Sequence, residues 1–318
     1  MNISVVGCGR WGSFLAWYLN RQGHCVTLYG RENSDRFSAL KETRTNGLVT
    51  LDDAVSLTSE LDRAAASAQI LVLSIGAQNL RSLMVQLSEL PLGGKTIVLC
   101  MKGIEARTGK RLTQVVAEYA PDVPTAIWVG PGHVQNFTRG IPNCMVIDSL
   151  DTGTKEFLVK AFSSDLIRFY YGTDLLGNEV GAAAKNVIGI AAGMLDGLNK
   201  TALKGALMSR GTREIARLIR AMGGSELTAY GLSHLGDYEA TVFSEFSHNR
   251  RFGELFVRGE RYGELAEGVA TTTALLLLGE RYGTELPICK AVDAVVNGGK
   301  EPNGVLSDLF LRSIKMEF

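Results

Sequence analysis

Short runs of β-branched and aliphatic residues alternate with amphipathic, helix-like stretches along the first half of the chain. The apolar runs are ISVV at 3–6, VTLY at 26–29, ILVLS at 70–74, TIVLC at 96–100 and AIWV at 126–129. Strands that alternate with helices indicate βαβ units on a parallel sheet. Two further runs, CMVID at 144–148 and IRFYY at 167–171, predict strands that extend this sheet.

The second half of the chain has a different pattern of hydrophobic positions. From about Thr173 onward the hydrophobic positions follow helical spacing, and no proline occurs between Pro142 and Pro287. The predicted fold is therefore an α/β Rossmann-type dinucleotide-binding domain over residues 1–174, with a parallel-rich sheet, followed by an all-α substrate domain over residues 175–318.

One stretch of the second half is apolar almost throughout. It is VGAAAKNVIGIAAGML at 180–195, where Lys185 and Asn186 are the two residues that are neither apolar nor glycine. As a helix, this segment is enclosed nearly all round. Lysine is rarely buried unless it is paired, and desolvation lowers the pKa of its ammonium group. Lys185 is therefore a candidate acid–base group; the alternative is a lysine whose side chain extends to solvent.

A partner for this lysine is available downstream. The loop GLSHLGDYEAT contains Asp237, with Thr241 four residues later. The segment FSHNRRFGELFVRGE then supplies Ser247, His248 and Asn249, followed by two arginines. These groups are candidates for binding an anion; the alternative is a solvated basic loop.

The first predicted strand runs into Gly7-x-Gly9-x-x-Gly12, and a helical pattern follows. Glycines at this spacing permit a tight turn and a close approach of backbone to a pyrophosphate, while the helix N-terminus adds partial positive charge. The strand–loop–helix context predicts dinucleotide binding rather than an ordinary glycine-rich turn. Arg10 adds a positive charge inside the loop.

Residues at other strand ends bear on the ligand. After the second predicted strand, Arg31 follows a glycine at the usual carboxylate position, which favours NADP, whereas Glu32 keeps NAD open. Lys102 follows one later strand, and a Gly-Pro-Gly loop from Gly130 to Gly132 follows the next. Ligands of open α/β sheets bind at this edge.

Composition narrows the classes of partner. The chain has 33 Lys plus Arg and 33 Asp plus Glu, so no net field favours nucleic acid or membranes. The longest apolar run is shorter than the ~18 residues of a membrane span, and MNISVVG lacks the basic segment of a signal peptide. Five widely spaced cysteines and four histidines without paired spacing indicate neither a disulfide framework nor a metal site. We expect a cytoplasmic protein.

The motifs together resemble a known family. GCGRWGSFLA, MKGIE, GPGH, EVGAAAKNVIGIAAGMLDGL, MSRGTREI, GLSHLGDYEAT, SHNRRFG and AEGVATT come in the order and spacing of the bacterial NAD(P)-dependent glycerol-3-phosphate dehydrogenases, from residue 1 to about residue 280. The resemblance implies a homodimer that uses NADP or NAD. Its substrate is a small phosphorylated three-carbon compound, because the family reduces dihydroxyacetone phosphate to sn-glycerol 3-phosphate for phospholipid synthesis.

The resemblance also implies residue roles. Lys185 is the proton donor and acceptor, supported by Asn186, Asp237 and Thr241, and Lys102 contacts both substrate and cofactor. The expected cofactor contacts, including the glycine loop, are Gly7, Gly9, Arg10, Trp11, Gly12, Arg31, Lys102, Val134, His248, Asn249, Leu265 and Glu267. The expected substrate contacts are Lys102, Gly130, Gly132, Lys185, Asp237, Ser247, His248 and Asn249.

The chain departs from the family pattern at several positions. The family has Gly-Pro-Ser where this chain has Gly-Pro-Gly, with Gly132 in place of the serine. The family also has arginine where this chain has His248, and Arg250 or Arg251 is a candidate to replace that charge. The usual GLAGLGDL reads GLSHLGDY here. Histidine neither stays charged near neutral pH nor binds phosphate in the bidentate manner of arginine. Two alternatives therefore stay open: a reductase of another small ketone or 2-keto acid, and a non-catalytic nucleotide-binding protein.

Overall fold

The computed structural model describes residues 1–311 and divides into two compact units. The first unit comprises Met1–Lys102 and Lys110–Glu179. The second comprises Gly103–Gly109 and the described part of Val180–Phe318. Within residues 1–311, no helix is both long enough and apolar enough to cross a membrane.

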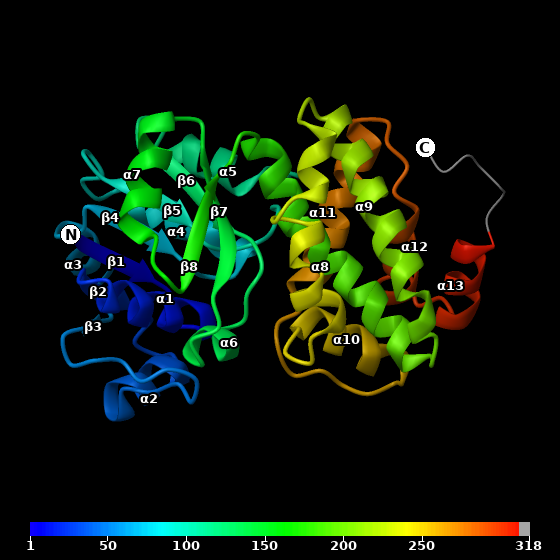
Figure 1. The fold of residues 1–318 in the computed structure, drawn as a ribbon, viewed down its shortest axis with the longest axis horizontal. Coiled ribbons are helices and arrows are strands. Elements are labelled where there is room, and N and C mark those ends of the chain that lie inside the picture. Colours follow the sequence, from blue (N-terminus) through cyan, green and yellow to red (C-terminus); the bar gives the residue numbers. More distant parts are fainter. Residues whose placement is uncertain (312–318) are drawn as a thin grey trace. The chain divides into compact units, whose positions relative to one another are not determined.

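An eight-stranded sheet in the order β3-β2-β1-β4-β5-β6-β7-β8 forms the centre of the first unit (Figure 1). Its strands are β1 (Asn2–Val6), β2 (Cys25–Tyr29), β3 (Ser56–Thr58), β4 (Ile70–Leu73), β5 (Thr96–Leu99), β6 (Thr125–Val129), β7 (Asn143–Ser149) and β8 (Ile167–Tyr171). All neighbouring pairs are parallel except β6 with β7. This sheet confirms the expected α/β class. The apolar runs did not predict β3, because its three residues, Ser-Leu-Thr, make no such run.

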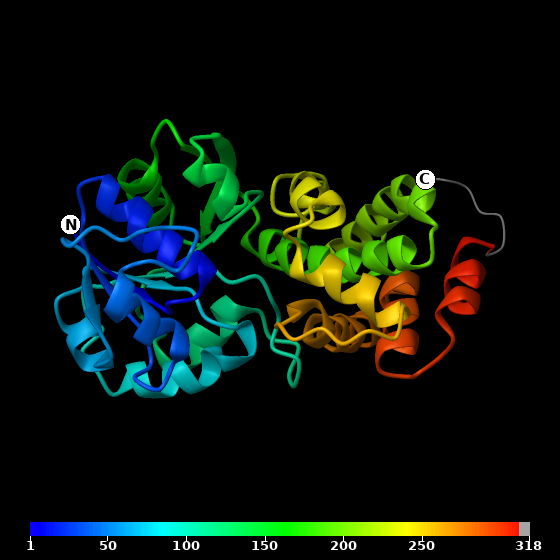
Figure 2. The ribbon, with the colours of Figure 1, turned by 90° about the horizontal axis from the view of Figure 1, so that it is seen from below.

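Helices cover both faces of this sheet. They are α1 (Arg10–Arg21), α2 (Asp35–Thr43), α3 (Leu61–Ala66), α4 (Leu80–Ser88), α5 (Leu112–Tyr119), α6 (Val134–Thr138) and α7 (Thr152–Phe162), with a 3₁₀ turn, η1 (Ala77–Asn79). Helices α1 and α7 lie on one face, and α3, α4 and α5 on the other (Figure 2). The Tyr18 hydroxyl of α1 donates to the Phe162 carbonyl of α7. This contact fixes the helix that begins at the glycine loop.

From Val180 onward, the regular elements of the second unit are all helical within the described residues, which confirms the expected helical C-terminal region. Its elements are α8 (Leu175–Gly197), whose first residues belong to the first unit, and then η2 (Thr201–Leu203), α9 (Lys204–Ala221), η3 (Glu226–Tyr230), η4 (Leu235–Asp237), the π-helical turn η5 (Glu239–Phe243), α10 (His248–Val257), α11 (Glu267–Arg281), α12 (Pro287–Val296) and α13 (Pro302–Phe310).

Helix α8 is the central element of this unit, because every residue from 180 to 195 is buried. Glycines let α10 pack directly on its backbone. A Cβ at Gly193 would lie 1.8 Å from the Arg250 carbonyl oxygen, and one at Gly253 would lie 2.1 Å from the Ile190 carbonyl oxygen. The two helix backbones are therefore in contact, which holds the start of α10 against the helix that carries Lys185.

A buried carboxylate fixes the start of α12. Glu214, on α9, accepts hydrogen bonds from the backbone amides of Ile288 at 2.8 Å and Cys289 at 3.1 Å. These amides have no partner within their own helix at its first turn, so the carboxylate acts as a cap. Burial raises the pKa of Glu214 to about 7, although the two amides act in the opposite direction.

Candidate active site

The glycine loop of the first unit has the shape that a dinucleotide requires. Gly7 adopts φ +116°, and a Cβ there would lie 2.2 Å from the Ser74 carbonyl oxygen. A Cβ at Gly12 would lie 1.8 Å from the Gly7 carbonyl oxygen, whereas one at Gly9 would meet open space. Gly9 is also the N-cap of α1, with no capping side chain among the described residues. The loop therefore exposes backbone at a helix N-terminus, which fits a pyrophosphate.

Positive side chains gather after β2. Burial raises the pKa of the Cys8 thiol, while the nearby Arg36 and Arg31 guanidinium groups lower it, so both charges lie close to this end of the strand. Arg31 itself is exposed. The Glu32 carboxylate lies 2.7 Å from Lys41 Nζ. The Glu32 carboxylate is thus paired with a lysine.

Further predicted residues lie at the ends of β5 and β6. Lys102 Nζ donates to the Gly130 carbonyl at 2.7 Å, so the lysine is anchored across the two strand ends. Gly132 adopts φ +143°, and a Cβ there would lie 2.4 Å from the Phe137 ring. Trp11 of the glycine loop packs against the same ring, with centroids 6.2 Å apart. Val134 begins α6 and is buried.

The second unit brings Lys185, Asp237 and Thr241 together. Lys185 Nζ lies 2.7 Å from Asp237 Oδ2 and donates to Thr241 Oγ1 at 2.8 Å. The lysine side chain is 9% exposed and the aspartate side chain 1%, so the ion pair is almost dry. The carboxylate favours the ammonium form of the lysine, which opposes the effect of burial. Lys185 is therefore a paired buried cation and does not extend to solvent.

The segment around the start of α10 connects to the same helix. Asn249 Oδ1 accepts from the Gly268 amide at 2.9 Å, and a Cβ at Gly268 would lie 2.7 Å from the Asn186 carbonyl oxygen. Asn249 thus ties α10 and α11 beside the residue that follows Lys185. Ser247 is the N-cap of α10 and accepts from the Arg250 amide. Glu267 opens α11; Leu265, just before it, is 66% exposed.

The basic residues after Ser247 are engaged by neighbours. His248 Nδ1 is hydrogen-bonded to the Tyr262 hydroxyl. Arg250 Nη1 lies 2.7 Å from Asp196 Oδ2, and its Nε donates to the Ser244 carbonyl at 3.0 Å. Arg251 Nη1 lies 3.1 Å from a Glu254 oxygen. Arg250 therefore clamps the loop that precedes α10.

The sequence reading assigned no role to His234, Tyr238 or Glu214. His234 and Tyr238 flank Asp237, and both are fully buried. Their one signal in the sequence was the departure of GLSHLGDY from the family pattern. Glu214 gave no signal, because a single acidic residue in an amphipathic helix looks like a surface residue.

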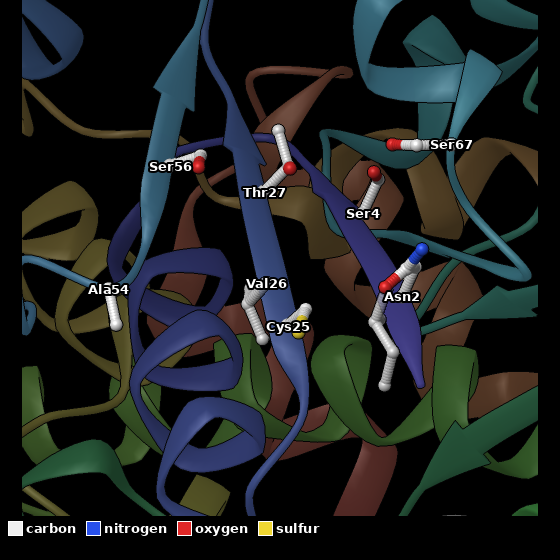
Figure 3. Close-up of a pocket in the computed structure, with 9 residues that line it drawn as sticks. Asn2, Ser4, Cys25, Val26, Thr27, Ala54, Ser56 and Ser67 are labelled. Carbon is white, nitrogen blue, oxygen red and sulfur yellow. The ribbon is translucent and has the colours of Figure 1, made fainter.

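A surface hollow of about 160 Å³ in the first unit lies away from these residues (Figure 3). It is lined by Asn2, Ile3, Ser4, Cys25, Val26, Thr27, Ala54, Ser56 and Ser67. These residues belong to the beginnings of β1, β2 and β3 or to adjoining segments, whereas the glycine loop follows the end of β1. The hollow is therefore at the wrong edge of the sheet to take part in the predicted site.

Comparisons with known proteins agree with these features. Residues 2–155 match the family model for the NAD-dependent glycerol-3-phosphate dehydrogenase N-terminus, and residues 174–307 match that for its C-terminus. The chain is 39% identical to glycerol-3-phosphate dehydrogenase (NAD(P)+) of Bradyrhizobium sp. (strain ORS 278), over 99% of this chain and 98% of the relative. It is 34% identical to the protein of that name from Thermoanaerobacter sp. (strain X514), over 100% and 99%.

The fold agrees as well. The crystal structure of glycerol-3-phosphate dehydrogenase from Coxiella burnetii superposes with a TM-score of 0.92 at 25% identity, covering 98% of this chain and 99% of that one. Both halves of the chain, its length and its fold thus match one group of NAD(P)-dependent oxidoreductases. The chain belongs to the NAD-dependent glycerol-3-phosphate dehydrogenase family.

Proposed function

We propose that this protein is an NAD(P)-dependent sn-glycerol-3-phosphate dehydrogenase that reduces dihydroxyacetone phosphate for phospholipid synthesis. The observation that carries the proposal is the buried Lys185–Asp237–Thr241 group, in a chain whose family is established over both halves. A binding module would have no use for a desolvated lysine, whereas a ketone reductase needs a positioned proton donor. The protein acts as a homodimer in the cytoplasm.

The two parts of the chain divide the chemistry. Residues 1–174 bind the cofactor through the loop from Gly7 to Gly12, with Arg10, Trp11, Arg31, Lys102 and Val134 as contacts. When bound, the dinucleotide supplies a hydride to the C2 carbonyl carbon of the substrate, or accepts one from C2 in the reverse direction. NADP is preferred, because Arg31 and Arg36 offer positive charge for a 2′-phosphate and Glu32 is paired with Lys41.

Residues 175–318 supply the proton. The Lys185 ammonium donates it to the carbonyl oxygen during reduction and recovers it, as the amine, during oxidation. Asp237 holds the ammonium by charge, and Thr241 Oγ1 accepts a hydrogen bond from one of its N–H groups. These two contacts fix the direction of the lysine, which lowers the entropy lost in reaching the reactive geometry.

The phosphate of the substrate is bound by Ser247, His248 and Asn249, at the N-terminus of α10, and by Lys102. A helix N-terminus carries partial positive charge, which partly replaces the guanidinium that the family has at position 248. Gly130 and Gly132 contact the substrate through backbone. Asn186 supports the proton donor Lys185 beside it. Two further contacts to the cofactor come from Leu265 and Glu267.

A second candidate rests on the altered loop at Gly132. Gly132 has no side chain, so the hydroxyl that the family provides is absent, and the Phe137 ring occupies the space where a side chain would begin. A reductase of another small ketone or 2-keto acid would explain this change.

The test is the oxidation of NADPH and of NADH, followed by absorbance, with dihydroxyacetone phosphate as substrate. Unphosphorylated dihydroxyacetone and ketopantoate serve as comparison substrates. We expect turnover of the phosphorylated ketone, faster with NADPH, and its loss in Lys185→Ala. Lys95→Met is the matched control, because Lys95 is also buried but bonds to backbone carbonyls of the first unit. A preference for an unphosphorylated carbonyl would select the second candidate.

A further inference from the structure

Two residues that depart from the family pattern, His234 and Tyr238, are hydrogen-bonded to each other. In GLSHLGDY, histidine stands where the family has glycine and tyrosine where it has leucine. The Tyr238 hydroxyl lies 2.7 Å from His234 Nε2, and the two rings meet edge to face at 4.9 Å. Both side chains are 0% exposed. They flank Asp237, the proposed partner of the proton donor.

The other nitrogen of His234 reaches helix α8. His234 Nδ1 lies 2.8 Å from the Gly181 carbonyl oxygen. Since a carbonyl can only accept, Nδ1 carries the proton, and Nε2 of the neutral ring accepts from the Tyr238 hydroxyl. In an α-helix the Gly181 carbonyl is also the acceptor for the amide of Lys185. The imidazole and the backbone amide of Lys185 therefore share the Gly181 carbonyl as their acceptor.

The backbone of His234 also sets the position of Asp237. The Asp237 amide donates to the His234 carbonyl at 3.0 Å, closing the 3₁₀ turn η4. A Cβ at Gly181 would lie 3.0 Å from His234 Cβ, so the loop sits as close to α8 as a glycine permits. His234 thus connects the Asp237 turn to the Lys185 helix from both its main chain and its side chain.

Burial, more than the neighbouring charges, keeps the imidazole of His234 neutral. Burial lowers the pKa of His234 to about 4; the Gly181 hydrogen bond and the Asp237 charge act against this, and the Lys185 charge acts with it. Burial also raises the pKa of Tyr238, whose other titratable neighbours are Glu214 and Cys289. The ring is therefore neutral throughout the range in which such an enzyme works. It serves as an anchor through its Nδ1–H and carries no charge.

We propose that His234 is a positioning residue, which holds the Asp237 carboxylate at ion-pair distance from Lys185 by bonding to the Gly181 carbonyl. The proposal rests on the proposed function of Lys185. Tyr238 completes the anchor by orienting the imidazole, and Thr212 of α9 is a further hydrogen-bond partner of its hydroxyl.

Three substitutions distinguish the contributions of the two hydrogen bonds that the imidazole makes, to the Gly181 carbonyl and to the Tyr238 hydroxyl. His234→Asn keeps a donor near the position of Nδ1, His234→Gln keeps a polar group near Nε2, and His234→Leu removes both. We expect His234→Asn to stay within about threefold of wild-type kcat. A misplacement of about 1 Å costs roughly 10²-fold, so His234→Gln and His234→Leu should lose kcat on that scale, with KM for NADPH unchanged.

The pH profile provides a readout that a loss of folded protein would not move. If the Lys185–Asp237 distance grows from 2.7 Å to about 4 Å, the carboxylate stabilises the ammonium less. The pH at which ketone reduction falls off should then decrease by about one unit in His234→Leu. Hydrogen exchange of the amides from 237 to 241 should accelerate in the same variant. His24→Leu is the matched control, because His24 also bonds to a backbone carbonyl, that of Ala161 in the first unit.

Each result bears on the proposal. A smaller kcat with an unshifted pH profile and unchanged exchange would overturn it, because His234 would then only stabilise the fold. Equal losses in His234→Asn and His234→Leu would overturn the assignment of the anchor to the Gly181 bond. If wild type does not turn over dihydroxyacetone phosphate, the proposed function fails, and hydrogen exchange alone decides whether His234 anchors the turn.

Discussion

The buried Lys185–Asp237 pair permits a test that separates stability from chemistry. We consider Lys185→Met, Asp237→Asn and the double variant. Each single change leaves one charge buried without its partner, whereas the double change leaves none. Methionine retains the unbranched shape of lysine, and asparagine retains that of aspartate, so packing is nearly constant across the set.

The magnitudes follow from the geometry. At a separation of 2.7 Å and an effective dielectric constant of about 20, the attraction is about 6 kcal/mol. Removing each ion from water costs several kcal/mol, so the intact pair adds little net stability. Breaking it from one side should lower the free energy of unfolding by about 3–5 kcal/mol, because the remaining ion stays desolvated. The double variant should lie within about 1 kcal/mol of wild type.

The assay is urea-induced unfolding at neutral pH, followed by far-ultraviolet circular dichroism, with turnover measured on the same samples. We expect both single variants to be unstable and inactive, and the double variant to be stable and inactive. A double variant as unstable as the single ones would refute the reasoning, since the pair would then be a structural element. A double variant that retains turnover would remove Lys185 as the proton donor.

Three further predictions concern other parts of the chain. Gly12→Ala should weaken NADPH binding, measured by fluorescence titration, by at least about tenfold, because its Cβ would collide with the Gly7 carbonyl. Glu214 binds its proton more tightly when folded (pKa about 7) than when unfolded, so the free energy of unfolding should fall by roughly 3 kcal/mol as pH rises from about 4.5 to 7; urea unfolding of Glu214→Gln should lack this component. Gly132→Ser should lower the melting temperature in thermal unfolding, because the added side chain would meet the Phe137 ring and because φ +143° is strained for serine.

The fold was largely predictable because its signals are local. Strands buried on both faces require continuous apolar runs, and such runs gave β1 and β4 to β7 directly; β2 and β8, which are buried mainly on one face, still had runs rich in β-branched and aromatic residues. The glycine loop was recognisable because Gly7 and Gly12 are each required by a backbone carbonyl close to them, those of Ser74 and Gly7 respectively, and both glycines stand in one short motif. Strand β3 escaped because a three-residue strand at the edge of a sheet has no run to detect.

The site was predictable only in part. Burial of Lys185 followed from its apolar neighbours, but its partners lie far along the chain, with Thr241 separated from it by 56 positions. No spacing rule connects such positions. The loop sequence offered Asp237 and Thr241 only as candidates, and the family resemblance supported their roles. The engagement of Arg250 by Asp196 and the binding of Tyr262 by His248 depend on how helices pack, and neither leaves a mark in the local sequence.

Several departures from the family pattern come with a partner of their own, although the buried Ser233 hydroxyl has none among the described residues. Gly132 leaves room for the Phe137 ring, and His248 is bound by Tyr262. His234 and Tyr238 satisfy each other inside a fully buried loop. A single polar replacement there would have left a donor or acceptor unsatisfied, which costs more than the bond itself contributes. The paired change at positions 234 and 238 therefore alters the surroundings of the proposed proton donor and leaves the lysine–aspartate pair in place.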